Sequence, residues 1–155
     1  MKEYRTQEMM SQEGMEKTLK KFAEYLTVTD GKETFNIKIP PKFVRCNYEE
    51  NTMVYVYEMQ PWMANPMGTI HGGIIATIMD TTMGSMTYYM AGESFTPTVT
   101  MKVDYVYYGT PDRPVYVGCK CTRCGKAMAY VTAKCWQDDE DKPIATADGV
   151  FYAAH

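Results

Sequence analysis

Residues 70–91 read IHGGIIATIMDTTMGSMTYYMA, and this stretch decides the fold. Apolar and small residues occur on every side of it at helical spacing, and Asp80 is its only charged residue. A helix that is apolar on all sides is buried on all sides. Two glycines follow His71, where the helix is expected to begin, and Gly92 is a suitable stop. The stretch therefore predicts one long, central, buried helix.

The segments on both sides of this helix have the composition of β-strands. Before it, residues 43–48 and 52–59 are rich in β-branched and aromatic residues. Four longer strands are expected after it, over residues 96–108, 115–123, 127–138 and 142–153. The turns between these four are short, which favours antiparallel pairing of successive strands. The pattern predicts an α+β fold, with one antiparallel sheet curled around the central helix.

An additional helix is expected near the N-terminus, over residues 6–26. Its apolar stripe recurs at helical spacing and consists of Met15, Leu19, Phe22, Ala23 and Leu26. The polar turn at residues 29–32 would end it. The expected organisation is a helical extension over residues 1–31 and one domain over residues 32–155.

Composition narrows the range of functions. The chain has 155 residues and a net charge of -3, which argues against a general nucleic-acid role because phosphate binding relies on a basic surface. No apolar run approaches the roughly 20 residues of a membrane span. The polar N-terminus lacks the apolar stretch of a secretory signal. A cytoplasmic protein with no nucleic-acid or membrane partner is expected.

Cysteine usage predicts reduced thiols. The five cysteines are Cys46, Cys119, Cys121, Cys124 and Cys135. An odd number without an export signal argues against a disulfide framework. Cys121-x-x-Cys124 could begin a metal site, but such a site needs a second ligand pair, and the other cysteines lie in predicted strands. We therefore expect thiols packed in the sheet and no metal.

The start of the central helix is the first candidate for chemistry. First-turn N–H groups have no partner within a helix, and the helix dipole makes this end attractive to negative charge. Glycines let a ligand approach the backbone, so the N–H of Gly72 or Gly73 is a candidate oxyanion donor for an acyl carbonyl. His71 and Asn65 could orient the loop or touch the ligand.

Asp80 is the second candidate for chemistry. Within one chain it cannot act on the same atom as the N–H groups at the start of the helix. It lies nine residues beyond His71, which is roughly 13 Å along a helix. If both groups serve one reacting carbon, Asp80 must come from a neighbouring subunit. A single sheet also cannot enclose the whole helix, so its remaining surface is expected to face a second copy in a two-fold dimer.

The spacing of these residues resembles the signature of hotdog-fold thioesterases. The pattern is Asn65-x-x-Gly68-x-x-His71-Gly72-Gly73, followed by Asp80 and Gly84. The subgroup that it resembles most is the PaaI-like type, which includes phenylacetate-degradation proteins and thioesterase superfamily members. The strand TPTVTMKVDY at residues 96–105 and the ending PIATADGVF at residues 143–151 are also similar to that family. The resemblance covers about residues 43–152.

The resemblance implies a role for each matching residue. Asp80 would be the catalytic carboxylate, which activates water or attacks the thioester. The Gly72 N–H would polarise the thioester carbonyl, while His71 and Asn65 would help to place it. Thr98 lies where some members carry a serine or threonine that positions the water. Asp80 and Thr98 would face Gly72 of the partner chain.

The implied activity is hydrolysis of an acyl-CoA or related acyl thioester to free acid and thiol, with no cofactor. Met67, Gly68 and Gly73 are expected to line the substrate site, and the subunits to form a dimer or a tetramer of paired dimers. Two alternatives stay open. One is a non-catalytic acyl-CoA-binding or regulatory hotdog protein. The other is a hydratase or dehydratase that would use His71 and Asp80 as a proton-moving pair.

Overall fold

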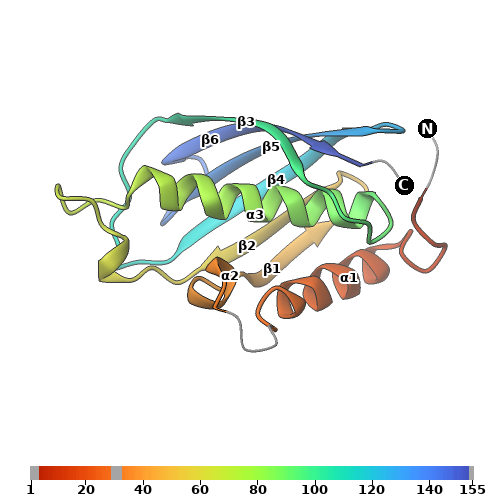
Figure 1. Cartoon of the computed structure of the whole chain (residues 1–155), viewed down its shortest axis with the longest axis horizontal. Helices are drawn as coiled ribbons and strands as arrows, with labels where there is room; N and C mark the ends of the chain where they lie inside the picture. The colour runs from red at the N-terminus through yellow and green to blue at the C-terminus, as the bar shows by residue number, and fades with distance from the viewer. Residues whose placement is uncertain (1–3, 29–32, 154–155) are drawn as a thin grey trace.

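The structure, a computed structural model, describes residues 4–28 and 33–153, and it has the expected α+β hotdog architecture. A six-stranded antiparallel sheet curves around one long helix, α3 (Gly72–Met90) (Figure 1). The strands are β1 (Lys42–Asn47), β2 (Thr52–Tyr57), β3 (Thr98–Tyr105), β4 (Val115–Cys124), β5 (Met128–Trp136) and β6 (Ala145–Tyr152). Two short helices, α2 (Phe35–Lys38) and the 3-10 turn η1 (Pro61–Met63), were not expected from the sequence.

The order of the strands differs from the expected pairing of successive strands at one place. The sheet order is β1-β2-β4-β5-β6-β3, so β3 pairs with β6 and not with β4. The turn at residues 109–112 is therefore not a hairpin between neighbours. It is part of a connection from one edge of the sheet to its middle. This leaves β3 at an edge, running back along α3 (Figure 1).

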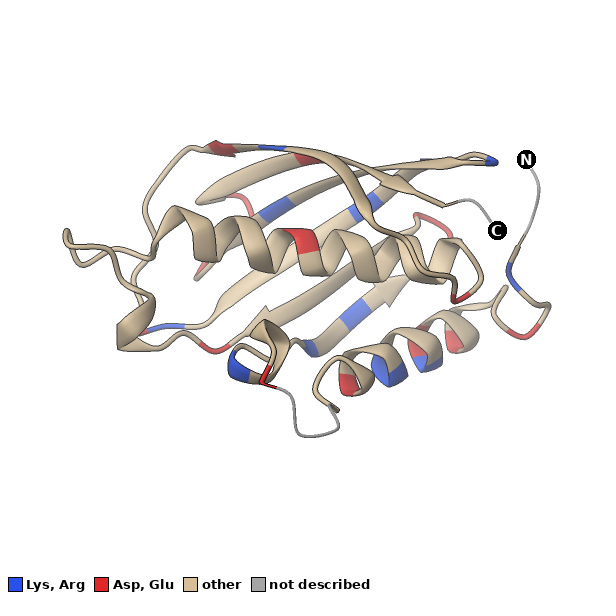
Figure 2. Cartoon of the chain, in the orientation of Figure 1, with Lys and Arg blue, Asp and Glu red and all other residues tan. Residues whose placement is uncertain are grey.

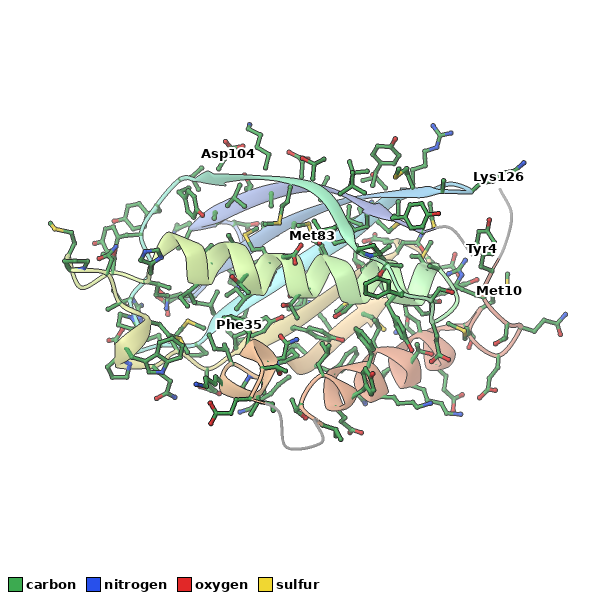
Figure 3. The ribbon with its side chains drawn as sticks, viewed as in Figure 1. Tyr4, Met10, Phe35, Met83, Asp104 and Lys126 are labelled. Atoms are coloured by element: carbon green, nitrogen blue, oxygen red, sulfur yellow. The ribbon has the colours of Figure 1, made fainter. Side chains whose placement is uncertain are left out.

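Burial of α3 confirms the central-helix prediction. Ile78, Met79, Met83 and Met86 have no exposed surface, and they pack against the concave face of the sheet. Side chains fill this space, with Met83 near its middle (Figure 3). Methionine suits such a core because its unbranched side chain adapts to irregular gaps. No helix in residues 4–28 or 33–153 combines the length and the hydropathy that a membrane span requires.

Helix α1 (Gln12–Tyr25) begins six residues later than expected. The Ser11 hydroxyl accepts a hydrogen bond from the Gly14 N–H at 3.0 Å, which is a strong N-terminal cap. The helix packs on β1 and α3 and contributes Met15 and Leu19 to the core around α3. The expected turn at residues 29–32, with the domain boundary at residue 31, lies outside the described residues.

The chain before α1 packs against the far end of α3. The Tyr89 hydroxyl donates to the Met9 carbonyl at 2.8 Å, and the Arg5 guanidinium lies 5.2 Å from the centre of the Tyr89 ring. Gly92 ends α3 with a φ of 66°, as its position predicted. A Cβ atom there would lie 2.3 Å from the Tyr4 carbonyl oxygen, so only glycine fits. The N-terminal segment thus covers the C-terminal end of α3, whereas the N-terminal end of α3 is not covered in this way.

Candidate functional site

Asn65 organises the loop that leads into α3. Its side-chain oxygen accepts hydrogen bonds from the N–H groups of Met67 at 2.9 Å and Thr69 at 3.3 Å. Its amide nitrogen donates to the Thr69 hydroxyl at 2.8 Å, and its carbonyl accepts from the Gly68 N–H. Gly68 has a φ of 79°, a conformation that glycine adopts without strain. Asn65 therefore shapes the loop from within, and the Met67 side chain is 85% exposed.

His71 separates the roles of the two glycines. It is the N-cap of α3, and its Nδ1 accepts the Gly73 N–H at 2.9 Å. In the neutral ring the proton then lies on Nε2. No acceptor within residues 4–28 and 33–153 takes the Gly72 N–H. The Gly72 N–H is thus the donor at this helix start that remains available to a ligand.

Tyr105, on β3, contacts Gly72 at the start of α3. This contact was not predicted from the sequence. The Tyr105 hydroxyl donates to the Gly72 carbonyl at 2.8 Å, and its ring lies 3.2 Å from where a Cβ on residue 72 would be. Tyr105 is the last residue of the strand singled out from the sequence. Its role was hidden because the contact depends on β3 running back beside α3.

Asp80 lies midway along the helix and is the one charged position on α3 (Figure 2). Its side chain is half-buried, and its Oδ1 accepts a hydrogen bond from the Thr98 hydroxyl at 2.7 Å. The structure therefore brings together Asp80 and Thr98, the two residues that the resemblance paired. Thr98 lies at the first position of β3, so one strand contacts both candidate parts of the site.

One protomer does not bring Gly72 and Asp80 together. They are eight residues apart on one continuous helix, which separates them by about 12 Å. Residues on one side of α3 stay partly exposed, each of them three or four residues from another member of the set: Gly73, Ala76, Thr77, Asp80, Gly84 and Tyr88. The sheet and α1 cover the rest of α3, so this stripe is the uncovered face of the helix.

A pocket of about 610 Å³ lies beside Asp80. Its walls come from α3, from the C-terminal end of α1, and from residues 93–98, which precede and begin β3. The apolar lining consists mainly of Phe22, Tyr25, Leu26, Tyr88, Phe95 and Phe151. A carboxylate in the wall of a pocket that also has aromatic lining can act on the polar group of a ligand whose apolar tail lies against the rings. Sequence reasoning did not find this pocket, because it joins segments that are far apart in the chain.

The cysteines are reduced and mostly inaccessible. Cys119, Cys121, Cys124 and Cys135 are buried, and Cys46 is half-buried. Burial raises the pKa of the Cys121 and Cys135 thiols to about 12 each. Across the described ranges, no three His, Cys, Asp or Glu side chains are grouped so as to hold a metal ion. The Cys121-x-x-Cys124 spacing reflects two thiols that face the core on either side of a β-bulge.

Comparison with known proteins identifies the family. The family model described as thioesterase superfamily matches residues 67–144, half of the chain. The chain belongs to the thioesterase superfamily. This thioesterase-superfamily chain is 36% identical over 73 residues to the acyl-coenzyme A thioesterase THEM4 of Xenopus laevis. That match covers 47% of this chain and 29% of THEM4, so the chain spans less than a third of its relative.

Solved structures share the fold of this superfamily member. A phenylacetic acid degradation-related protein from Ralstonia eutropha, described as a putative thioesterase, aligns with a TM-score of 0.73 at 15% identity. The alignment covers 84% of this chain and 98% of that one. A Streptococcus mutans protein bound to acetyl-CoA aligns with a TM-score of 0.67 at 16% identity, covering 81% and 95%. The PaaI-like arrangement of sheet and central helix is therefore confirmed.

Thiol reactivity tests the burial of the cysteines. Since the thiolate is the reactive form and burial raises the thiol pKa values, we expect a disulfide reagent at pH 8 to modify at most Cys46 within minutes. All five thiols should react after denaturation, and Cys46→Ser should remove the one fast reaction. Fast labelling of any thiol in folded Cys46→Ser would contradict the buried arrangement.

Proposed function

We propose that the protein hydrolyses acyl-CoA or a related acyl thioester, at sites that two copies of the chain build together. Hydrolysis needs a donor that stabilises negative charge on the carbonyl oxygen, and a base or nucleophile near the carbonyl carbon. The available Gly72 N–H at the helix start supplies the first. Asp80, with Thr98 bonded to it, supplies the second. The observation that carries the proposal is the Gly72 N–H without an acceptor at the start of the same helix that carries the half-buried Asp80.

The distance between Gly72 and Asp80 along α3 determines how two protomers must be arranged to share a site. A two-fold axis that passes beside α3 near Ala76, perpendicular to the helix, places residue 72 of one copy opposite residue 80 of the other, because the paired helices then run antiparallel. The residues at the crossing are small, namely Gly73, Ala76 and Thr77, and small residues let two helices approach closely. One such axis creates two identical sites, as in most closed homodimers.

The edge strand β3 is the second part of this interface. Its outer edge has no neighbouring strand among the described residues, and Val99 and Tyr105 on it are each 55% exposed. An unpaired edge is a template for pairing with another chain. Antiparallel pairing of β3 with its symmetry mate would join the two sheets and cover the exposed stripe of α3. Dimerisation therefore buries the face on which the site lies.

The reaction uses the groups in a fixed order. The thioester carbonyl oxygen accepts the Gly72 N–H, and the positive end of the helix dipole favours its growing negative charge. Asp80 then takes a proton from an attacking water that Thr98 helps to place, or attacks the carbonyl carbon itself. The carbon–sulfur bond breaks and the thiolate takes up a proton. In the first route the free acid then leaves; in the second the acyl group is held on Asp80 as an anhydride, which water hydrolyses to the free acid and the Asp80 carboxylate. Water adds an oxygen to the acyl group by either route.

The relatives support the substrate class. THEM4 is named as an acyl-coenzyme A thioesterase, and the Streptococcus mutans protein was solved with acetyl-CoA. His71 Nε2–H faces outward beside the helix start, where it can donate to the same thioester or to the thiol portion of the ligand. The His71 Nδ1 is already taken by the Gly73 N–H, so in the hydratase alternative only Nε2 of His71 could move a proton.

Replacing Asp80 tests the activity. We expect wild type to release thiol from acyl-CoAs, and Asp80→Asn to lower kcat by a hundredfold or more, because the amide can neither take a proton nor attack. Circular dichroism and a sizing column would show that the variant keeps its fold and assembly. Tight acyl-CoA binding without turnover by wild type would instead favour a non-catalytic binding protein. Equal turnover by both proteins would exclude Asp80 from the site.

Mixing two inactive variants tests whether the site is shared. Gly72→Pro removes the N–H at a helical position where proline is tolerated, and Gly72→Ala keeps the N–H with the same Cβ crowding against Tyr105. We expect Gly72→Pro to lose more activity than Gly72→Ala. Denaturing and refolding equal amounts of Gly72→Pro and Asp80→Asn together should restore about a quarter of wild-type activity, since half the dimers would hold one intact site. No recovery in dimers shown by mass spectrometry to be mixed would mean that each chain builds its own site.

A further inference from the structure

The pocket beside Asp80 continues along α3 and ends at an aromatic stack. Asp80, Gly84 and Tyr88 are four residues apart and lie on one side of the helix, so the pocket extends about 12 Å from the carboxylate to the Tyr88 ring. Gly84 contributes no side chain, and the Phe151 ring lies 3.7 Å from where its Cβ would be. Together they form the floor of a trough between the carboxylate and the stack.

A side chain of α1 closes the end of the trough. The Phe22 ring stacks on the Tyr88 ring with a centroid separation of 3.9 Å and an interplanar angle of 14°. That distance is van der Waals contact, so nothing can pass between the rings. The Tyr25 ring also stacks with Phe22, with a centroid separation of 6.0 Å. Phe22 lies outside residues 67–144, so it belongs to the part of the chain that the family model does not match.

Two hydroxyls in the wall are hydrogen-bonded within the protein. The Ser85 hydroxyl donates to the Thr81 carbonyl at 2.7 Å, and the Thr81 hydroxyl donates to the Asn36 side chain. Asn36 and Thr96 also line the pocket, but Gly84 and the aromatic rings give an apolar surface between Asp80 and Tyr88, which suits a hydrocarbon tail. Glu93 lies on the rim beside Tyr88, and its charge would repel an acyl group that carries a carboxylate at its far end.

We propose that this trough holds the acyl chain, and that the Phe22–Tyr88 stack limits it to uncharged acyl groups of medium length. The inference rests on the proposed function and adds the substrate class. An extended chain with carbon–carbon bonds of about 1.5 Å advances about 1.25 Å per carbon. A trough of about 12 Å therefore takes about eight to ten carbons before the chain meets the stacked rings. Phe22 of α1, stacked on Tyr88, thus acts as the length stop.

The dependence of hydrolysis on acyl-chain length tests whether the Phe22–Tyr88 stack limits the chain. The substrates are saturated acyl-CoAs from C2 to C16, with hydrolysis measured as kcat/KM. We expect wild type to prefer C8 to C10 and to fall at least tenfold by C16. Phe22→Ala opens the end of the trough, so its kcat/KM for C14 and C16 should rise at least tenfold while its C4 value stays within twofold. Phe22→Trp fills the end and should move the preference to shorter chains.

A matched control separates the stop from a general loss of packing. Phe35→Ala removes a partly buried ring on α2 that does not line the trough, so it should leave the length profile unchanged. The inference fails if Phe22→Ala and Phe35→Ala have the same profile, or if wild type hydrolyses C16 as well as C8. The opposing change expected of Phe22→Trp tests the same point if Phe22→Ala does not fold.

The affinity of Asp80→Asn for acyl-CoAs tests the length limit separately from the proposed hydrolysis. The dissociation constants of the same acyl-CoAs for Asp80→Asn should fall about three- to fourfold per methylene up to C10 and then level off. In Asp80→Asn/Phe22→Ala they should keep falling to C16. This result would support the trough even if wild type hydrolyses nothing, which would overturn only the proposed activity. Affinity that does not depend on chain length would overturn the trough itself.

Discussion

Burial of α3 is the constraint on which the rest of the structure depends. The helix has no polar face, so every side of it needs a cover, and a sheet of six strands with α1 leaves one stripe uncovered. Asp80 is placed on that stripe, where a carboxylate keeps contact with water and with the Thr98 hydroxyl. A fully buried carboxylate without partners would cost several kcal/mol. The surface that the fold cannot cover is therefore the surface that carries the polar group.

The strand order places β3 in contact with both candidate parts of the site, Asp80 and Gly72. β3 pairs with β6 at the sheet edge, which lets it run back along α3 towards the helix start. Its first residue, Thr98, donates to Asp80, and its last residue, Tyr105, donates to the Gly72 carbonyl. Pairing with β4, as the short turn at residues 109–112 suggested, would have moved both contacts away from α3. A rigid strand thus sets the positions of two groups that are about 12 Å apart on the helix.

The sequence predicted the fold because its strongest signals are local. An all-round apolar helix and β-rich segments are visible in short windows, and the strand bounds were close to those of the structure. The pairing of Asp80 with Thr98 came from the family resemblance, and the structure places the two in contact. The role of His71 in occupying the Gly73 N–H, the contact of Tyr105 with Gly72, and the pocket could not be predicted. The Tyr105 contact and the pocket join segments that are far apart in the chain, and their separation in space depends on strand order, which no local pattern encodes. The His71–Gly73 bond spans only two residues, but it depends on the orientation of the imidazole ring, which the residue pattern does not specify.

The central claim is that two copies of the chain hold one thioester between the Gly72 N–H of one protomer and Asp80 of the other. A crystal structure of Asp80→Asn with a bound C8 acyl-CoA tests it most directly. We expect the thioester oxygen about 3 Å from the Gly72 nitrogen, with the substituted side chain at position 80 of the other protomer beside the carbonyl carbon and the acyl chain directed towards Tyr88. A thioester bound away from the Gly72 nitrogen, or contacted by residues 72 and 80 of a single protomer, would contradict this claim.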